Sequence, residues 1–375
     1  MEISPLEFFD ALADNSIDFF SGVPDSLLKE FCFCIDDRAA KQKHIIAANE
    51  GNAIALAAGY HLATDKIPLV YMQNAGFGNA INPLLSLCDR NVYSIPMLIV
   101  IGWRGEPEVG DEPQHVKQGK VTLKLFDLLD IPYRIMPDTN SEVKDCLDHL
   151  IKIASEKKTP VALVVKKNTF KEYKLEQKKD TLFELTREES IKLIVGKLNP
   201  VDIVVSTTGK TSRELYEYRE QLQQGHNKDF LVIGSMGHSS QIALAIALEK
   251  PLRQVFCLDG DGSVIMHMGS LAIIGSQKVS NFKHIIINNG SHDSVGGQPT
   301  VGFSISFANI VKACGYKTCL EASTVNDIGN KVEILKAIEG PALLEIKVRG
   351  GSRIDLGRPK AIKKNKDDFM EFLSE

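Results

Sequence analysis

Short apolar runs alternate with amphipathic or small-residue segments along most of the chain, and many of the runs end at a turn rich in Gly, Asn or Asp. Apolar runs that alternate with helical segments are typical of parallel sheets covered on both faces. In the first half, this pattern predicts strands over residues 17–23, 43–48, 68–73, 96–103, 133–136 and 160–166. It predicts helices over 5–13, 52–63, 121–129 and 141–157, and a long polar loop over 104–120. The first half therefore reads as a doubly wound α/β sheet.

A second series with the same rhythm follows a lysine- and glutamate-rich stretch, 171–180, which has no apolar face and is expected to link two domains. Thr186-Arg187-Glu188-Glu189 resembles a capping box that opens a new helix. Strands are then expected over 202–206, 230–233, 254–258, 283–287, 317–321 and 342–348. We therefore expect an α/β protein with two doubly wound parallel-sheet domains, residues 1–175 and 181–375. Their similar size and rhythm suggest an ancient duplication.

The composition is that of an ordinary soluble globular protein, with 43% hydrophobic and 25% charged residues over 375 positions. A formal net charge of −4 argues against a nucleic-acid partner. The 7 cysteines are an odd number scattered mostly through apolar elements, so they do not suggest a disulfide framework. The first residues resemble no secretory signal, and no apolar run is long enough to cross a bilayer. We expect a cytoplasmic protein without membrane contact.

The turn Gly260-Asp261-Gly262-Ser263 follows an apolar run and is the first candidate for chemistry. Gly260 and Gly262 would let the backbone approach a phosphate closely, and the N-terminus of the following helix favours an anion. The carboxylate of Asp261 would repel that phosphate unless a divalent cation lay between them. Mg²⁺ prefers a few hard oxygen ligands together with substrate phosphates. The turn therefore predicts a metal-bridged phosphate site.

Further ligands come from the turn after the next apolar run, Asn288-Asn289-Gly290. Asn289 could supply an amide oxygen and Ser291 a backbone carbonyl. In a parallel sheet both turns would lie at the carboxyl ends of neighbouring strands, where such folds bind ligands. A Rossmann-type turn is the alternative, and it would make the protein a nicotinamide oxidoreductase. Against it, asparagines occupy the place of the acidic residue that would bind the ribose.

The Gly-Asp-Gly-Ser and Asn-Asn pair resembles the diphosphate–Mg²⁺ motif of thiamine-diphosphate enzymes. The order of motifs along nearly the whole chain resembles the short decarboxylases of that family, in which a pyrimidine domain is followed directly by a diphosphate domain, without a middle domain. Several stretches are similar to the phosphonopyruvate decarboxylases, with the sulfopyruvate decarboxylases as the nearest sibling group. These stretches are residues 21–28, 76–83, 102–107, 111–115 and 294–300.

The resemblance gives Glu50 a role that its position supports. It follows an apolar run and precedes a helix of small residues, so its carboxylate should be partly buried at a strand end. In this family such a carboxylate lies against N1′ of the aminopyrimidine and promotes loss of the thiazolium C2 proton. An ordinary helix-start carboxylate favoured by the helix dipole is the alternative.

The resemblance also implies a cofactor seat in the second domain. Met236 would wedge beneath thiamine diphosphate and force its V shape, and the Gly234 carbonyl would hold the 4′-amino group; a methionine filling a core gap is the alternative. The predicted cofactor-binding residues are Thr207, Thr208, Gly209, Gly234, Ser235, Met236, Gly260, Asp261, Gly262, Ser263 and Asn289, with Asp261, Asn289 and Ser291 as ligands of Mg²⁺. The stretch that holds Thr207, Thr208 and Gly209 could equally be a satisfied helix N-cap.

The implied reaction is the non-oxidative decarboxylation of phosphonopyruvate. Arg104 is a candidate cation for the phosphonate, with Arg353 and Arg358 as weaker ones. Asp25, His115 and His292 could move protons or orient the substrate, or serve structure alone, and Asn74 could contact substrate or cofactor. The 104–120 loop is either a lid that excludes water or a solvated connection.

In this family Glu50 of one chain reaches a cofactor seated in another, so we expect a homodimer or a higher homo-oligomer with shared active sites. Sulfopyruvate or a simple 2-keto acid are alternative substrates. An inactive protein with the cofactor fold is a further alternative, and the presence of Glu50, Asp261 and Asn289 together argues against it.

Overall fold

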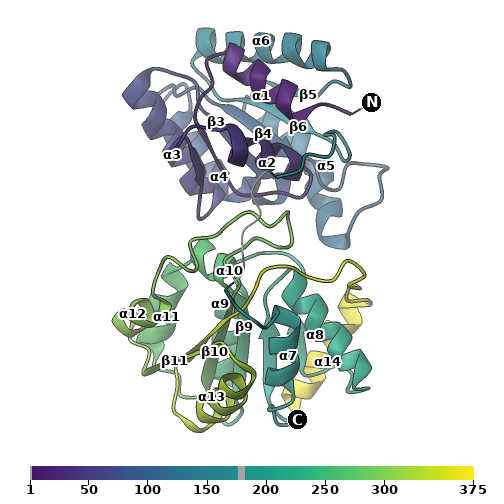
Figure 1. Ribbon diagram of the computed structural model, residues 1–375, viewed down its shortest axis with the longest axis vertical. Coiled ribbons are helices and arrows are strands. Elements are labelled where there is room, and N and C mark those ends of the chain that lie inside the picture. The colour runs from purple at the N-terminus through teal and green to yellow at the C-terminus, as the bar shows by residue number, and fades with distance from the viewer. Residues whose placement is uncertain (1, 176–181) are drawn as a thin grey trace. The chain divides into compact units, whose positions relative to one another are not determined.

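The computed structural model describes residues 2–175 and 182–375, and the chain divides into two compact units, residues 1–179 (unit 1) and 180–375 (unit 2) (Figure 1). The predicted linker, 171–180, lies in part outside the described residues. The boundaries predicted for the two domains, 1–175 and 181–375, stay a prediction.

Unit 1 is built on a six-stranded sheet with strand order β2-β1-β3-β4-β6-β5, in which every neighbouring pair is parallel. Its strands are β1 (Phe20–Gly22), β2 (His44–Ile46), β3 (Leu69–Gln73), β4 (Leu98–Gly102), β5 (Tyr133–Ile135) and β6 (Val161–Val165). Its helices are α1 (Pro5–Asp14), α2 (Lys29–Arg38), α3 (Glu50–Thr64), α4 (Phe77–Pro83), α5 (Pro113–Leu128) and α6 (Asn140–Lys157), with a 3₁₀ turn η1 (Asn74–Gly76) and a π turn η2 (Leu84–Cys88).

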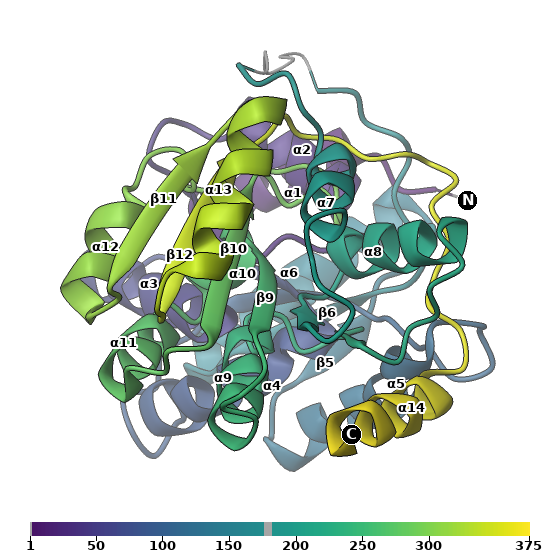
Figure 2. The same cartoon turned by 90° about the horizontal axis from the view of Figure 1, so that it is seen from below.

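Unit 2 has a second six-stranded parallel sheet with strand order β11-β12-β10-β9-β7-β8. Figure 2 shows β11, β12, β10 and β9 side by side. The strands are β7 (Ile203–Ser206), β8 (Asp229–Leu231), β9 (Val255–Gly260), β10 (Phe282–Asn288), β11 (Thr318–Ala322) and β12 (Ala342–Lys347). The helices are α7 (Arg187–Val195), α8 (Lys210–Gln221), α9 (Ser239–Glu249), α10 (Asp261–Met266), α11 (Gly269–Gln277), α12 (Phe307–Cys314), α13 (Val325–Ala337) and α14 (Ile362–Ser374).

Each sheet separates two apolar cores, because alternate side chains of its buried strands point to opposite faces. In unit 1, helices α1, α2 and α6 cover one face and α3, α4 and α5 cover the other. In unit 2, α9, α11, α12 and α14 cover one face and α7, α8 and α13 cover the other. This explains why the strands read as unbroken apolar runs: the five residues of β4 and of β6 are all buried. The predicted doubly wound α/β architecture is confirmed.

The two sheets share one strand order when the strands of unit 2 are numbered from its own first strand. The strands remain parallel, but the order in which the chain adds them to each sheet reverses beside that first strand. This switch point lies between β1 and β3 in unit 1 and between β7 and β9 in unit 2. Ligands of open parallel sheets bind outside the carboxyl ends of the strands at this switch point. Each unit therefore offers one such position.

The loop predicted over 104–120 is shorter than expected, because α5 already begins at Pro113. Proline is well suited to the first helical position, where its missing N–H is not needed. Gly119, within the stretch predicted to be a loop, lies inside the helix against the backbone of Gly105: a Cβ on Gly119 would come within 1.6 Å of the Gly105 carbonyl oxygen. Close packing, and not chain flexibility, explains this glycine.

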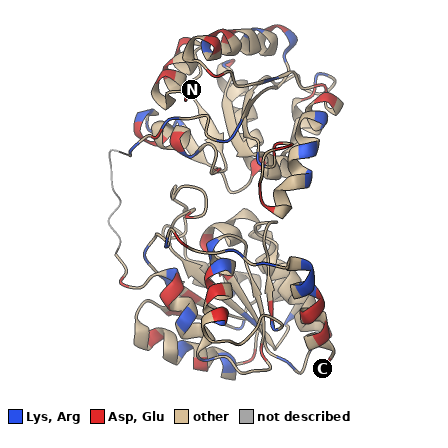
Figure 3. Ribbon diagram, turned by 90° about the vertical axis from the view of Figure 1, so that its right-hand side faces the viewer, with Lys and Arg blue, Asp and Glu red and all other residues tan. Residues whose placement is uncertain are grey.

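Charged residues of both signs are interspersed along the helices of each unit (Figure 3). The seven cysteines are free thiols. Among the helices that the structure describes, none is both long enough and apolar enough to span a membrane.

Candidate active site

Glu50 lies at the switch-point edge of unit 1 as the first residue of α3, whose N-cap is Asn49. Its side chain is buried, and Oε2 accepts a hydrogen bond of 2.8 Å from Nδ2 of Asn79. Gly76 leaves the space that this carboxylate fills, since a Cβ at that position would lie 1.9 Å from Oε1. Burial raises the pKa of Glu50, and the hydrogen bond from Asn79 opposes that shift. The carboxylate is thus held in one place and partly desolvated.

Asp25 follows β1 and is fully buried beside the end of β3. Oδ1 accepts a hydrogen bond of 2.5 Å from Nε2 of Gln73, and Oδ2 accepts one of 3.1 Å from the Leu27 amide. A Cβ on Gly102 would lie 1.9 Å from Oδ2, so a second glycine makes room for a second acid. Burial raises the pKa of Asp25, and the hydrogen bond from Gln73 opposes the shift. The carboxyl groups of Glu50 and Asp25 therefore keep a proton to higher pH than a free acid does.

Arg104, after β4, has its guanidinium group engaged within unit 1. Nε and Nη2 donate to the two carboxylate oxygens of Asp111 at 2.8 and 2.5 Å, and Nη1 donates to Oγ of Ser26 at 3.0 Å. The side chain of Asn74 holds the Arg104 backbone through hydrogen bonds of 2.8 and 3.1 Å. His115 lies in the first turn of α5. Together these contacts brace the loop before α5, so the roles in substrate binding predicted for Arg104 and Asn74 stay predictions.

Asp261 is the first residue of α10, immediately after β9, and is 1% exposed. Oδ2 accepts a hydrogen bond from Oγ1 of Thr300, and Oδ1 accepts a long one, 3.4 Å, from the backbone N–H of Asn289. Among the residues that the structure describes, its hydrogen-bond partners are thus a hydroxyl and backbone amides, without the positive charge that a buried carboxylate needs. Burial consequently raises the pKa of Asp261 to about 6. A hard divalent cation bound to this carboxylate would supply the missing positive charge.

The turn after β10 lies beside Asp261, because β9 and β10 are paired neighbours. Asn289 is buried, and its Oδ1 accepts a hydrogen bond of 3.1 Å from the Ser291 amide. His292 lies against Gly262: a Cβ on that glycine would come 2.9 Å from Cε1 of the ring. Desolvation lowers the pKa of His292 to about 4, so the imidazole is neutral near pH 7. The predicted ligands Asp261, Asn289 and Ser291 therefore belong to one edge of one sheet.

The other predicted cofactor contacts gather around Ser263 in α10. Its Oγ lies 2.9 Å from Oγ1 of Thr207 and accepts a hydrogen bond of 3.1 Å from the Gly237 amide. These contacts join the ends of β7 and β9 and the turn after β8, which ends at Leu231. That turn carries Gly234, Ser235 and Met236, while Thr208 and Gly209 lie between β7 and α8. Met236 approaches Gly262, with its Cε 3.4 Å from where a Cβ would be.

Several residues that complete these two edges were not predicted as site residues. Gln73 and Asn79 bind the two buried acids of unit 1, Thr300 binds Asp261, and Gly76 and Gly102 make room. The stretches 76–83 and 294–300 had been singled out by resemblance, but nothing in their spacing says which acid each side chain meets.

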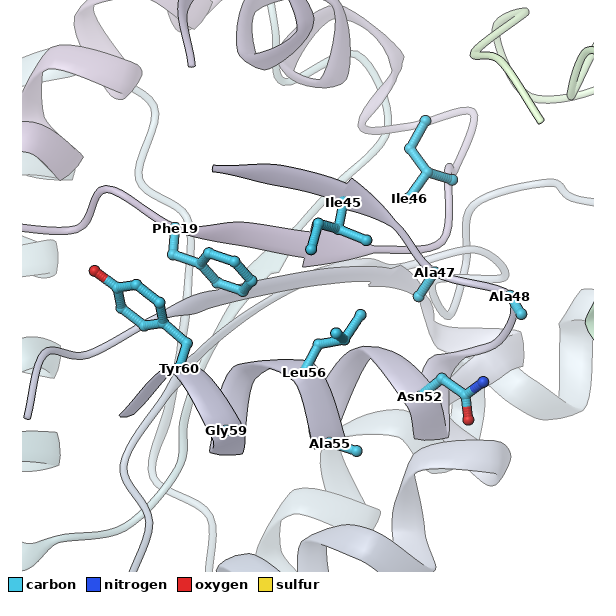
Figure 4. A pocket seen from close by; sticks show the side chains of 10 residues that line it. All are labelled: Phe19, Ile45, Ile46, Ala47, Ala48, Asn52, Ala55, Leu56, Gly59 and Tyr60. Carbon is cyan, nitrogen blue, oxygen red and sulfur yellow. The ribbon is translucent and has the colours of Figure 1, made fainter. Parts of the chain in front are cut away.

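An open apolar groove of about 750 Å³ lies elsewhere on unit 1, between the edge strand β2 and helix α3 (Figure 4). Ile45, Leu56 and Tyr60 line it together with several alanines. Leu56 is 36% exposed, and the groove lies along the helix that begins with Glu50.

Two family models match the chain. The N-terminal TPP-binding domain of thiamine pyrophosphate enzymes matches residues 7–126, and the C-terminal TPP-binding domain of the same enzymes matches residues 207–346. The first match contains Glu50 and Asp25, and the second contains Asp261 and Asn289.

Curated relatives extend over most of the chain. A phosphonopyruvate decarboxylase of Streptomyces hygroscopicus is 33% identical over 374 residues, covering 96% of this chain and 90% of its own. A sulfopyruvate decarboxylase of Methanosarcina acetivorans is 26% identical over 366 residues, covering 92% of this chain and 90% of its own. In Methanococcus maripaludis, the alpha subunit of sulfopyruvate decarboxylase is 32% identical over 157 residues (42% of this chain, 90% of its own). The beta subunit from the same organism is 39% identical over 132 residues (35% of this chain, 68% of its own).

Proposed function

Because the chain belongs to the thiamine pyrophosphate enzymes, in the branch of the phosphonopyruvate and sulfopyruvate decarboxylases, we propose that it converts phosphonopyruvate to phosphonoacetaldehyde and carbon dioxide. The bond between the keto carbon and the carboxylate breaks, carbon dioxide leaves, and a proton takes its place. The observation that carries the proposal is the buried Asp261 at the switch point of unit 2, a carboxylate that has no cationic partner within residues 2–175 and 182–375.

The residues at this edge fit thiamine diphosphate and Mg²⁺. Asp261 and the amide oxygen of Asn289 are hard oxygen donors, and Ser291 could add a carbonyl. The hydroxyl groups of Thr207 and Ser263 would bind phosphate oxygens. When bound, the cofactor supplies an electron sink for the bond that breaks, and the protein supplies orientation and electrostatics. Met236 and Gly234 would hold its ring system from the neighbouring turn.

Glu50 and Asp25 would handle protons on the unit 1 side. Glu50 would share a proton with the ring nitrogen N1′ of the cofactor, which its burial and raised pKa favour. Asp25, with its pKa also raised by burial, would hold or deliver a proton at the carbon that loses carbon dioxide. His115 and His292 would orient the substrate, and a neutral His292 could donate or accept one hydrogen bond.

Active sites shared between two copies of the chain complete the proposal, giving a homodimer or a higher homo-oligomer. The acid edge with Glu50 and the metal edge with Asp261 lie on different compact units. The sulfopyruvate decarboxylase of Methanococcus maripaludis has an alpha subunit that matches 42% of this chain and a beta subunit that matches 35% of it. We propose that the apolar groove beside α3 contributes to the contact with a second copy, since it runs along the helix that Glu50 begins. We also propose a cytoplasmic location, on the strength of the seven free thiols.

Sulfopyruvate is the second candidate substrate, favoured by the relatives that act on it. Phosphonopyruvate comes first because the identity to its decarboxylase is higher, 33% against 26% at similar coverage. The test is release of carbon dioxide from phosphonopyruvate, sulfopyruvate and pyruvate, each with thiamine diphosphate and Mg²⁺. The proposal expects the highest kcat/KM with phosphonopyruvate. A preference for sulfopyruvate would select the second candidate, and no turnover of any of the three would refute both.

A further inference from the structure

Asp293 is a buried carboxylate that no part of the proposed reaction uses, four residues after Asn289 in the loop that follows β10. Its side chain is 7% exposed. One oxygen, Oδ2, accepts three hydrogen bonds: 2.7 Å from Nδ2 of Asn289, 3.0 Å from Nη1 of Arg187 and 3.0 Å from the Gly351 amide. The carboxylate thus ties the metal-binding turn to α7 and to the segment after β12.

The bond to Asn289 decides which way that amide faces. A carboxylate only accepts hydrogen bonds, so the group that Asn289 turns toward Asp293 must be its NH₂ group. Oδ1 is then left on the other side, where it accepts one hydrogen bond from the Ser291 amide and keeps a second lone pair. With the amide flipped, two N–H donors would point at the metal, and Asn289 could not be a ligand.

Arg187 fixes Asp293 in turn. Its Nε and Nη2 donate to the two oxygens of Glu214 at 2.8 and 2.9 Å, which leaves Nη1 for Asp293. The guanidinium group is buried between the two acids, so its plane is set by the fork to Glu214. The position of Asp293 is therefore determined by two secondary elements, α7 and α8, and not by its own loop alone.

We propose that Asp293 is a positioning residue for the metal, which orients the Asn289 amide so that Oδ1 faces the cation. This inference rests on the proposed Mg²⁺ site. Partners of this kind, which orient a ligand without touching the metal, change metal affinity by about 10- to 100-fold when they are removed.

The test is a titration of the full-length protein with Mn²⁺, as a stand-in for Mg²⁺, in the presence of thiamine diphosphate, with free Mn²⁺ followed by electron paramagnetic resonance. Asp293→Ala should bind Mn²⁺ about 10- to 100-fold more weakly than the wild type. Asp293→Asn should retain most of the affinity, because its Oδ1 can still accept the hydrogen bond from Nδ2 of Asn289 that orients the amide. Asp293→Ser, whose hydroxyl is one bond shorter, replaces the alanine variant should that one not fold, and it should bind as weakly.

Glu217→Ala is the matched control, since Glu217 also accepts hydrogen bonds from an arginine, Arg353, and from a glycine amide, Gly357, within unit 2. It should leave Mn²⁺ affinity unchanged. Wild-type Mn²⁺ affinity in Asp293→Ala would overturn the inference. Equal losses of Mn²⁺ affinity in Asp293→Ala and Asp293→Asn would also overturn it, because they would assign the effect to the charge of Asp293 and not to its hydrogen bond with Asn289. A wild-type protein that binds no Mn²⁺ would overturn the proposed function and this inference with it.

Discussion

Gly76 leaves the space that the Glu50 side chain fills, so a substitution at Gly76 can move the Glu50 carboxylate without changing the chemical group. In Gly76→Ala, the new Cβ would lie 1.9 Å from Oε1, 2.3 Å from Cδ and 2.8 Å from Cγ of Glu50. Because the backbone of Gly76 is in the right-handed helical region, at φ −81° and ψ −11°, an alanine adopts it without strain. The clash must therefore be relieved by moving the side chain of Glu50.

Restoring ordinary carbon–oxygen contact from 1.9 Å requires a shift of the carboxylate of more than about 1 Å. A misplacement of about 1 Å at a reacting group can cost about 10²-fold in rate. We therefore expect kcat for decarboxylation of phosphonopyruvate to fall by about two orders of magnitude. The affinity for thiamine diphosphate should change much less, because the predicted Mg²⁺ ligands Asp261, Asn289 and Ser291 belong to unit 2.

The assay is steady-state release of carbon dioxide at saturating thiamine diphosphate and Mg²⁺, with calorimetry for cofactor affinity. Gly78→Ala, two residues on, is the matched control, since a Cβ there would meet no atom of the described residues within 4 Å. It should keep wild-type turnover and gain up to about 1 kcal/mol of stability from the better helix propensity of alanine. Wild-type turnover in Gly76→Ala would refute the placement of Glu50 as the reacting acid.

Three further expectations follow from the same geometry. Glu50→Gln should lower kcat by about 10²- to 10⁴-fold while leaving calorimetric cofactor affinity intact, and unchanged turnover would remove Glu50 from the reaction. Burial raises the pKa of Asp261 from 3.8 to about 6, so the folded state without a cation keeps this proton to higher pH than the unfolded chain. The free energy of unfolding should therefore fall by about 3 kcal/mol as the pH rises from 3.8 to about 6. Asp261→Asn should flatten this part of the profile in urea unfolding with EDTA, followed by circular dichroism; a profile as steep as that of the wild type would contradict the assignment. Dilution of the holoenzyme until sedimentation shows monomers should abolish turnover, whereas active monomers would disprove the shared site.

The sheets could be predicted from the sequence because both faces of their inner strands, such as β4 and β6, are buried. The runs at 161–165 and 285–287 are apolar, and the structure places β6 and β10 there. The capping box at Thr186 was recognisable for a similar reason, since both of its hydrogen bonds are local. The resemblance to thiamine-diphosphate decarboxylases is confirmed by the family models and the curated relatives.

Contacts between distant segments could not be predicted in this way. The stretch 104–120 was predicted to be a loop, but its glycines at 105 and 119 mark two backbones in close contact. Arg104 was predicted as a candidate cation for the phosphonate, and its ion pair with Asp111 could not be predicted, because it depends on how the loop folds. Asp293 and Arg187 are 106 positions apart, so neither carries a local signal of the bond that joins them. The edges of the two sheets were predictable, whereas the partners that hold each site residue in place needed the structure.

The central claim is that Asp261 holds a divalent cation that bridges it to the diphosphate of the cofactor. The most direct test is a calorimetric titration of thiamine diphosphate into the wild-type protein and Asp261→Asn, each with Mg²⁺ and with EDTA. The account predicts saturable binding by the wild type with Mg²⁺, and its loss both in EDTA and in the variant. Equal affinity with and without the cation, or in both proteins, would contradict it.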